Sequence, residues 1–235
     1  MNNWLEIAQD WLLPRQCALC AGDAGNSALC RRCVARLPRI TNACRGCGLP
    51  LPHGRLCGGC VGRHRPFRSV RIPFRYEPPL SALILALKFD ARLEVAAPLA
   101  GLLLAELERS SGALPALVVP VPLHPARVRR RGYNQALEIA RPLAAALGIG
   151  LAPHLVYRQR NTTAQSGLPN PAARRRNVRG AFAVSVDAAA APPQSVALVD
   201  DVVTTGATVR ELARVLTRAG VARIDLWFVA RAAPP

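Results

Sequence analysis

The segment from Ser195 to Leu216 constrains the fold more than any other part of this chain, because a strand, a loop and a helix follow one another within it. The apolar run Val196–Val199 has the length and composition of a buried strand, and Asp200 and Asp201 close it. Small and hydroxyl residues at 204–208 then lead into a helical pattern. This order is typical of a parallel α/β unit, in which ligands bind at the carboxyl ends of the strands.

The loop of this segment has the features of a phosphate site. A helix N-terminus presents unpaired backbone N–H groups and partial positive charge. Gly206 allows the backbone to approach an anion closely, and the hydroxyls of Thr204, Thr205 and Thr208 can donate further hydrogen bonds. The two carboxylates suit vicinal hydroxyls or water on a bound Mg²⁺. A sugar phosphate satisfies both halves, whereas the alternative is an ordinary strand-to-helix turn.

The segment resembles the phosphoribosyl pyrophosphate (PRPP) signature of the type I phosphoribosyltransferases. The resemblance implies that Asp200 and Asp201 hold the ribose hydroxyls and that the loop holds the 5′-phosphate. The implied PRPP-binding residues are Asp200, Asp201, Thr204, Thr205, Gly206, Ala207 and Thr208. Purine-specific members often carry an aspartate inside this loop, but Thr204 and Thr205 stand here, so a carboxylate base acting on a purine is not supported.

All eight cysteines lie between residues 17 and 60 as four C-x-x-C pairs, with nine residues between the pairs of each half. Paired C-x-x-C turns present four thiolates to one tetrahedral ion, so the pattern predicts two structural Zn²⁺ ions. Sequential pairing groups Cys17, Cys20, Cys30 and Cys33 in one site and Cys44, Cys47, Cys57 and Cys60 in the other. Interleaved pairing stays open. No ligand position is left for a substrate, which argues against catalytic zinc.

The formal charge of +17 comes almost wholly from arginine, since Lys88 is the only lysine. Eight thiolates and two Zn²⁺ would leave about +13, which still favours polyanionic partners such as nucleic acid or a polyphosphorylated substrate. A solvated basic surface is the alternative. Arginines alternate with aromatic residues in 63–76, which suits either single-stranded nucleic acid or an edge strand. The N-terminus lacks a secretory pattern and no stretch is long enough to span a membrane, so we expect a cytoplasmic protein without stable membrane insertion.

The order of the remaining segments predicts an α/β fold with a doubly wound, mostly parallel sheet. Helices are expected at 79–87, at 92–109 and up to 147 with a kink at Pro142, and strands at 70–76, 116–121, 151–157, 181–186, 196–199 and 224–230, with a loop at 188–194. We expect three parts: an amphipathic helix in 1–14, a double zinc ribbon in 15–62 and a ligand-binding domain in 63–235. The polar stretch 158–180 is expected to be a flexible loop of that domain.

Taken together, four motifs resemble the ComF family over almost the entire chain: the cysteine repeat, PVPLHPARVRRRGYNQA, RNTTAQSGLPNPAARRRNVRGAF and VDDVVTTGATV. The resemblance implies a type I phosphoribosyltransferase-like domain behind the zinc module. It also implies a role in DNA uptake during natural competence (transformation), with single-stranded DNA handled in the cytoplasm and a competence helicase or recombination mediator as partner. Some members of the family occur outside competence operons.

The type I resemblance implies further site residues and Mg²⁺ bound together with PRPP. The implied pyrophosphate loop comprises Val121, Pro122, Leu123 and His124, with Arg129 and Arg131 supplying charge. The stretch 158–180 corresponds to the catalytic loop that closes over PRPP, and Arg174 and Arg176 are its candidate catalytic residues. The alternative to a DNA-handling protein is an active phosphoribosyltransferase, a glycosyltransferase that transfers ribose 5-phosphate to a nucleobase. Whether turnover occurs stays open.

Overall fold

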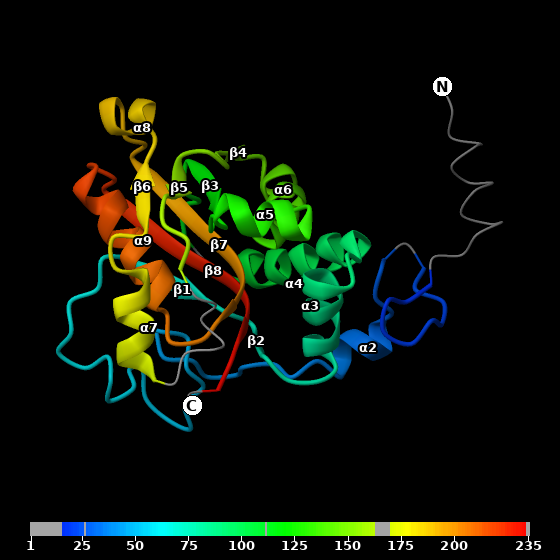
Figure 1. Cartoon of the computed structure of the whole chain (residues 1–235). Helices are drawn as coiled ribbons and strands as arrows, with labels where there is room; N and C mark the ends of the chain where they lie inside the picture. The colour runs from blue at the N-terminus through cyan, green and yellow to red at the C-terminus, as the bar shows by residue number, and fades with distance from the viewer. Residues whose placement is uncertain (1–15, 26, 111, 163–169, 234–235) are drawn as a thin grey trace.

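We analysed a computed structural model of the chain, which describes residues 16–25, 27–110, 112–162 and 170–233 (Figure 1). The helix expected in 1–14 lies outside the described residues, as does the 163–169 part of the polar stretch.

A parallel sheet forms the centre of the molecule, with strand order β1-β8-β7-β3-β4 and β2 also paired with β8. Every pair in this sheet is parallel. The strands are β1 (Ser69–Arg71), β2 (Phe74–Arg75), β3 (Leu117–Pro120), β4 (Gly150–Leu151), β7 (Ser195–Val203) and β8 (Arg223–Arg231). The middle strands are almost wholly buried because apolar side chains face helices on both sides.

Helices cover both faces of the sheet (Figure 1). One face carries α3 (Leu80–Phe89), the short 3₁₀ helix η1 (Leu93–Val95), α4 (Ala96–Glu108) and α6 (Gln135–Leu147). The other carries α9 (Ala207–Arg218), α7 (Pro171–Val178) and an antiparallel ribbon of β5 (Val156–Arg158) with β6 (Phe182–Val184). Short helices α2 (Arg31–Ala35), α5 (Pro125–Arg131) and α8 (Val186–Ala190) lie in the connections. The predicted doubly wound parallel sheet is therefore confirmed.

The strand order positions the site. From β7 the chain passes through α9 to β8, whereas from β3 it passes through α5 and α6 to β4 on the opposite side. Because the neighbours β3 and β7 lead their helices to opposite faces, the ends of these two strands diverge. A crevice at such a switch point is the usual ligand site of an open α/β sheet.

Several element boundaries differ from the prediction. Strand β7 does not stop before Asp200 but continues to Val203, because the sheet pairing with β8 extends that far. The expected strand 151–157 is two short strands, β4 and β5, that belong to different sheets. Residues 186–190, largely expected as loop, form α8 with Ser185 as its cap. Helix α6 continues through Pro142 without a break.

The polar stretch 158–180 is not loop throughout, since 171–178 form helix α7. Asn170 caps the helix by accepting a hydrogen bond from the N–H of Ala173 at 2.8 Å. Arg160 Nη2 donates to the carbonyls of Asn177 and Arg179, at 2.9 and 2.6 Å, which ties the C-terminal end of α7 to the end of β5.

The two halves of the cysteine region contact different parts of the domain. Cys17, Leu29 and Leu37 are buried in the same apolar cluster as α3 and α4. In the second half, Gly48 lies against Ile72, which belongs to the cluster on the α9 face. The second half therefore reaches the side of the sheet from which the phosphate loop starts.

Candidate functional site

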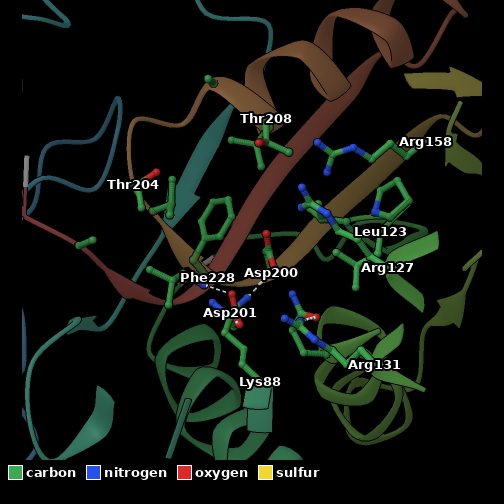
Figure 2. Close-up of a pocket in the computed structure, with 18 of the residues that line it drawn as sticks. Lys88, Leu123, Arg127, Arg131, Arg158, Asp200, Asp201, Thr204, Thr208 and Phe228 are labelled. Carbon is green, nitrogen blue, oxygen red and sulfur yellow. Dashed lines mark hydrogen bonds and ion pairs between the residues drawn. The ribbon is translucent and has the colours of Figure 1, made fainter. Parts of the chain in front are cut away.

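A cavity of about 740 Å³ lies at the switch point, at the carboxyl ends of β3 and β7 (Figure 2). Its wall is formed by the end of α3, the residues that follow β3, helix α5, the end of β5 and the segment that runs from β7 into α9. The volume is within the range of small-molecule sites in proteins. The two regions that sequence analysis assigned to ribose phosphate and to pyrophosphate therefore face one space.

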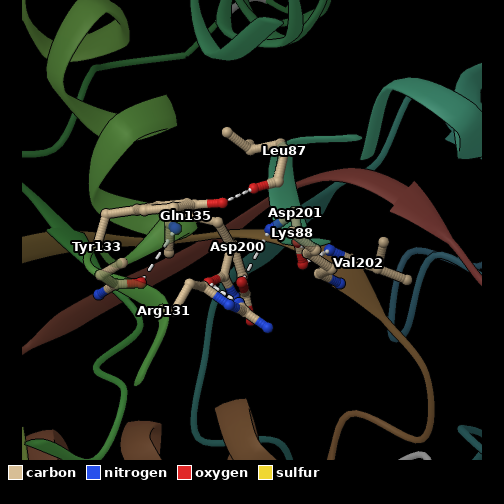
Figure 3. Close-up of polar contacts among 10 residues, drawn as sticks. Leu87, Lys88, Arg131, Tyr133, Gln135, Asp200, Asp201 and Val202 are labelled. Atoms are coloured by element: carbon tan, nitrogen blue, oxygen red, sulfur yellow. Dashed lines mark hydrogen bonds and ion pairs between the residues drawn. The ribbon is translucent and has the colours of Figure 1, made fainter. Parts of the chain in front are cut away.

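The two acidic residues at the end of β7 both line the cavity but are held differently. Asp201 is 2% exposed, and its Oδ2 lies 2.8 Å from Nζ of Lys88 on α3 (Figure 3). Its Oδ1 accepts the N–H of Val202 at 2.6 Å. Asp200 is partly exposed and its Oδ1 accepts the N–H of Asp201 at 2.9 Å, so its outer oxygen is the one presented to the cavity (Figure 2).

The charges of this group are coupled. Burial raises the pKa of Asp200 well above its ordinary value, the Asp201 carboxylate raises it further, and Lys88 opposes the shift. The pKa of Lys88 is raised because attraction to Asp201 outweighs the lowering effect of burial. One ammonium thus balances one carboxylate, and the second carboxylate lacks a full cationic partner of its own. A hydroxyl-rich or cationic ligand would stabilise its ionised form.

The predicted phosphate loop, residues 204–208, leads from β7 into α9. Gly206 has φ of 71°, a left-handed conformation that glycine adopts without strain, and it stands at the N-cap of the helix. Because Gly206 has no side chain, it cannot cap the helix. Thr205 Oγ1 accepts a long hydrogen bond from Ala207 N–H at 3.4 Å. Thr204, Thr205, Gly206, Ala207 and Thr208 all line the cavity. These residues surround the start of α9, and anion binding there stays a prediction.

Positive charge is concentrated in the part of the cavity that is formed by α5 and the end of β5. Arg127, Arg130, Arg131 and Arg158 line the cavity. Arg158 is 5% exposed, its guanidinium stacks over the ring of Phe182 at 5.3 Å, and its Nε has no hydrogen-bond partner among the described residues. Burial and Arg127 lower the pKa of Arg158 to about 10, and burial with Arg130 and Arg131 lowers that of Arg127. Like charges packed in this way favour a polyanionic ligand.

Hydrogen bonds fix the loop that follows β3. Asn134 Nδ2 donates to the carbonyl of Val121 at 3.1 Å, and Asn134 Oδ1 caps α6 by accepting from Ala136 N–H. The hydroxyl of Tyr133 donates to the carbonyl of Leu87, next to Lys88 (Figure 3). Gln135 accepts from Arg131 Nη1 at 2.5 Å. Tyr133 and Asn134 therefore hold the loop and α3 in place, whereas Gln135 also faces the cavity.

The structure does not bring every predicted residue to the cavity. Val121, Pro122, Leu123 and Arg131 line it. His124 instead caps α5, its Nδ1 accepting from Ala126 N–H at 3.2 Å, and Arg129 is exposed on the other side of that helix. Arg174 and Arg176 lie on α7 and are not among the cavity's described lining residues. Their catalytic role stays a prediction.

Sequence reasoning missed Lys88, Arg127, Arg158 and Phe89 as cavity residues. For Arg127 a signal was present, because Arg127, Arg130 and Arg131 fall three and four positions apart and so share one helix face. Lys88 was conspicuous as the only lysine. Arg158 and Phe89 gave no local signal, because only the folded chain shows where the ends of β5 and α3 lie.

The mouth of the cavity carries exposed apolar side chains from α3. Phe89 is 70% exposed and Leu85 is 42% exposed, and both line the cavity. The guanidinium of Arg131 lies 5.6 Å from the centre of the Phe89 ring. An exposed aromatic ring beside arginines is suited to a flat aromatic ligand that carries phosphate.

The cysteines form two four-sulfur clusters, Cys17 with Cys20, Cys30 and Cys33, and Cys44 with Cys47, Cys57 and Cys60, each with all ligand atoms within 4.8 Å of one another. This is the sequential grouping. The halves repeat one another in detail, since Cys30 N–H donates to Cys17 Sγ at 3.4 Å and Cys57 N–H donates to Cys44 Sγ at 3.3 Å. Backbone donors to sulfur stabilise thiolates, so both clusters fit structural Zn²⁺.

Comparison with known proteins adds three findings. A double zinc ribbon domain family matches residues 8–61. DNA utilization protein YhgH of Salmonella typhimurium is 38% identical over 228 residues, covering 93% of this chain and 98% of the relative. Its Escherichia coli K12 counterpart is 37% identical over the same shares, and competence protein F of Haemophilus influenzae is 34% identical over 92% of this chain and 97% of its own.

Among solved structures, glutamine PRPP amidotransferase from B. subtilis, complexed with ADP and GMP, matches 56% of this chain and 25% of its own, at 21% identity and a TM-score of 0.36. A second match, an allosteric regulatory enzyme of purine biosynthesis, has a TM-score of 0.34. In the described residues, no helix combines the length and apolar character needed to cross a membrane.

The sequence identities of 34–38% to these relatives extend along more than nine-tenths of the chain. The protein therefore belongs to the ComF family, together with DNA utilization protein YhgH and competence protein F.

Proposed function

We propose that this protein binds PRPP with Mg²⁺ in the cavity between β3 and β7 and takes part in DNA utilization, handling single-stranded DNA in the cytoplasm. The observation that carries the proposal is the set of charged groups that line one cavity: four arginines, the Asp200–Asp201 pair and a helix N-terminus. PRPP has an anionic diphosphate, a second phosphate and two vicinal hydroxyls, so each part has a complementary group.

The residues present fit this ligand. Arg158 provides a buried, unpartnered Nε and Arg127 a desolvated guanidinium, which suit the diphosphate. The N-terminus of α9 suits the 5′-phosphate, and the outer oxygen of Asp200 suits a ribose hydroxyl. Mg²⁺ favours carboxylate and phosphate oxygens, so Asp200 would be its protein ligand, and the ion would neutralise part of the charge of the diphosphate.

DNA handling is supported by the relatives and by the cavity mouth. The relatives carry the names DNA utilization protein and competence protein F, and the chain has a formal charge of +17. Phe89 and Leu85 offer apolar stacking area beside Arg130 and Arg131. We therefore assign the DNA-binding region to this mouth, and we propose a competence helicase or recombination mediator as the protein partner.

Binding of a labelled oligodeoxythymidine, followed by fluorescence anisotropy across a salt series, tests the DNA part. We expect affinity to fall steeply with salt and to fall about tenfold in Phe89→Ala, because stacking contributes about 1–3 kcal/mol per base. Val186→Ala, at an 85% exposed apolar residue on α8, is the matched control and should bind like the parent. Absence of binding at low salt would refute the assignment.

Active phosphoribosyl transfer is the second candidate, favoured by the position of Phe89, which is exposed at the mouth of the cavity that also holds the acidic pair. An aromatic acceptor stacked there would adjoin a bound sugar. Release of pyrophosphate from Mg²⁺·PRPP, measured with a panel of nucleobases and with single-stranded DNA, tests it, with Asp201→Asn as control. Release that depends on one acceptor supports transfer, whereas binding without release under every condition contradicts it.

A further inference from the structure

Arg231, the last residue of β8, stands between the second cysteine cluster and the phosphate loop. It is 7% exposed, so its guanidinium is almost fully removed from water. A small secondary cavity there is lined by Gly46 and Cys47 of the cluster region, by Thr205 and Gly206 of the loop, and by Arg231 itself. One buried cation therefore adjoins both features.

The charge of Arg231 lacks a carboxylate partner. None of the ion pairs found in 16–25, 27–110, 112–162 and 170–233 includes it. Its Nε has no hydrogen-bond partner in the same ranges. A buried arginine in this state is costly unless an anion lies beside it.

A second arginine also adjoins this cluster. A Cβ placed on Gly46 would lie 1.7 Å from Arg65 Nη1 and 3.0 Å from Cys60 Sγ, so Arg65 and Cys60 both press against that glycine. Arg65 Nη1 is likewise buried without a hydrogen-bond partner in the described part of the chain. A Zn²⁺ ion held by four thiolates has a net charge of about −2. Two arginines beside the cluster match that charge, so the surroundings fit a loaded site.

Only one of these arginines reaches the phosphate loop. Arg231 Nη1 donates to the carbonyl of Val203 at 3.1 Å, immediately before Thr204. The same carbonyl also accepts the N–H of Ala232 at 3.0 Å, so β7 and β8 stay joined here without the side chain. Arg65 is not among the described residues that line either cavity at the loop.

We propose that Arg231 is a positioning residue that links metal at the second cysteine cluster to the phosphate loop: the loaded cluster holds the guanidinium, and the guanidinium holds Val203 and thereby the start of the loop. The ligand-affinity part of this inference rests on the proposed PRPP site, but the loop-ordering part does not. The first cluster packs against the α3–α4 layer, and none of its cysteines lines either cavity. Loss of its metal should leave the loop unchanged.

Hydrogen exchange of the 203–208 amides, metal content and Mg²⁺·PRPP affinity by calorimetry test the proposal in the parent protein and in five variants of the same chain. Arg231→Met should keep both metal ions, exchange faster in the loop and bind PRPP about tenfold more weakly, as expected for a lost charge-assisted hydrogen bond. Arg65→Met is the matched control: it removes the other cluster cation and should leave loop exchange unchanged. Arg231→Lys keeps the positive charge but lacks the planar guanidinium, so its loop exchange and PRPP affinity should lie between those of the parent and Arg231→Met.

Cysteine variants at equivalent positions of the repeat complete the test. Cys57→Ser should lose one metal ion and exchange faster in the loop, whereas Cys30→Ser should lose the other ion without that effect. Unchanged loop exchange in Arg231→Met or in Cys57→Ser would overturn the proposal, and so would equal effects of Cys57→Ser and Cys30→Ser. If the parent protein binds no PRPP, the proposed function fails, but loop exchange still decides the role of Arg231.

Discussion

Nζ of Lys88, the only lysine in the chain, lies 2.8 Å from Oδ2 of Asp201, a carboxylate that is 2% exposed at the end of β7. Every other basic side chain apart from histidine is arginine. An ammonium is a compact point charge, whereas a guanidinium is a broad planar fork. The ion pair thus neutralises the inner carboxylate from the helical layer and leaves the outer one, Asp200, facing the cavity.

Lys88→Met should destabilise the protein by about 2–4 kcal/mol, because removing one partner leaves a buried carboxylate uncompensated. Chemical denaturation at constant metal content measures the effect. The double variant Lys88→Met/Asp201→Asn should recover part of the loss. Arg92→Met breaks the Arg92–Glu94 pair, whose side chains are 47% and 62% exposed, and should change stability by no more than about 0.5 kcal/mol. Equal losses in both single variants would contradict the assigned burial of the Lys88 pair.

Asp200→Asn should stabilise the empty protein near neutral pH, since ionising a carboxyl whose pKa is raised by burial and by Asp201 is unfavourable. The sign follows from linkage. A raised pKa means that the native state binds the proton more tightly than the unfolded state. The contribution of the protonated Asp200 to stability is therefore full below the ordinary pKa of 3.8, and it is lost as pH rises through the raised pKa.

The stability difference between Asp200→Asn and the parent should therefore widen over the pH range above the ordinary value of 3.8. Thermal unfolding without ligand measures it, and about 2–4 °C corresponds to each kcal/mol for a chain of this size. A difference that stays constant over this range, or an Asn variant that is less stable throughout, would show that Asp200 is not strained in the empty site.

Cys17→Ser should lose one of two metal ions. It should destabilise the apolar core around α3 and α4 as well as the first cysteine cluster. Cys17 is 3% exposed and shares an apolar core with Leu29, Leu37 and the helices α3 and α4. We expect a stability loss of about 2–5 kcal/mol, comparable with removal of other covalent or metal cross-links in small modules. Metal analysis together with denaturation checks this, and full metal content in the variant would remove Cys17 from the ligand set.

Arg158→Gln should weaken binding of inorganic pyrophosphate about tenfold or more, because a desolvated guanidinium that faces an anion contributes about 1.5–3 kcal/mol. Arg160→Gln is the control, since Arg160 is exposed and its Nη2 is bound to the carbonyls at the end of α7. Competition of pyrophosphate against a fluorescent ligand measures both variants. An equal affinity for the parent and Arg158→Gln would exclude Arg158 from the anion site.

Local pattern was enough to predict the fold class, the four C-x-x-C pairs and the acid–loop–helix segment, because each of these is local in sequence, whereas the pairing of the cysteines into two clusters needed the structure. The strand–helix alternation gives a parallel sheet, and equal spacing gives the repeated C-x-x-C turns. Prediction failed where pairing decides the boundary: β7 extends past Asp201 because β8 runs alongside it. Helices α7 and α8 were missed because their short sequences carry only capping residues, Asn170 and Ser185, as a signal.

The site was predicted only as far as it is local. Asp200 and the loop at 204–208 were identified from one segment, and the cavity joins them to residues from α3, α5 and β5. Lys88 precedes Asp201 by 113 residues and Arg158 precedes it by 43, and only the folded sheet brings them together. The same holds for Arg231, whose neighbours are the cysteines of another module.

Calorimetric titration of Mg²⁺·PRPP into the zinc-loaded protein tests the proposed ligand site. We expect saturable binding by the parent and by Asp187→Asn, an exposed aspartate on α8, and at least about tenfold weaker binding by Asp200→Asn, which loses a charged acceptor for a ribose hydroxyl. Absence of binding by the parent, or equal affinity in Asp200→Asn, would contradict the proposed site.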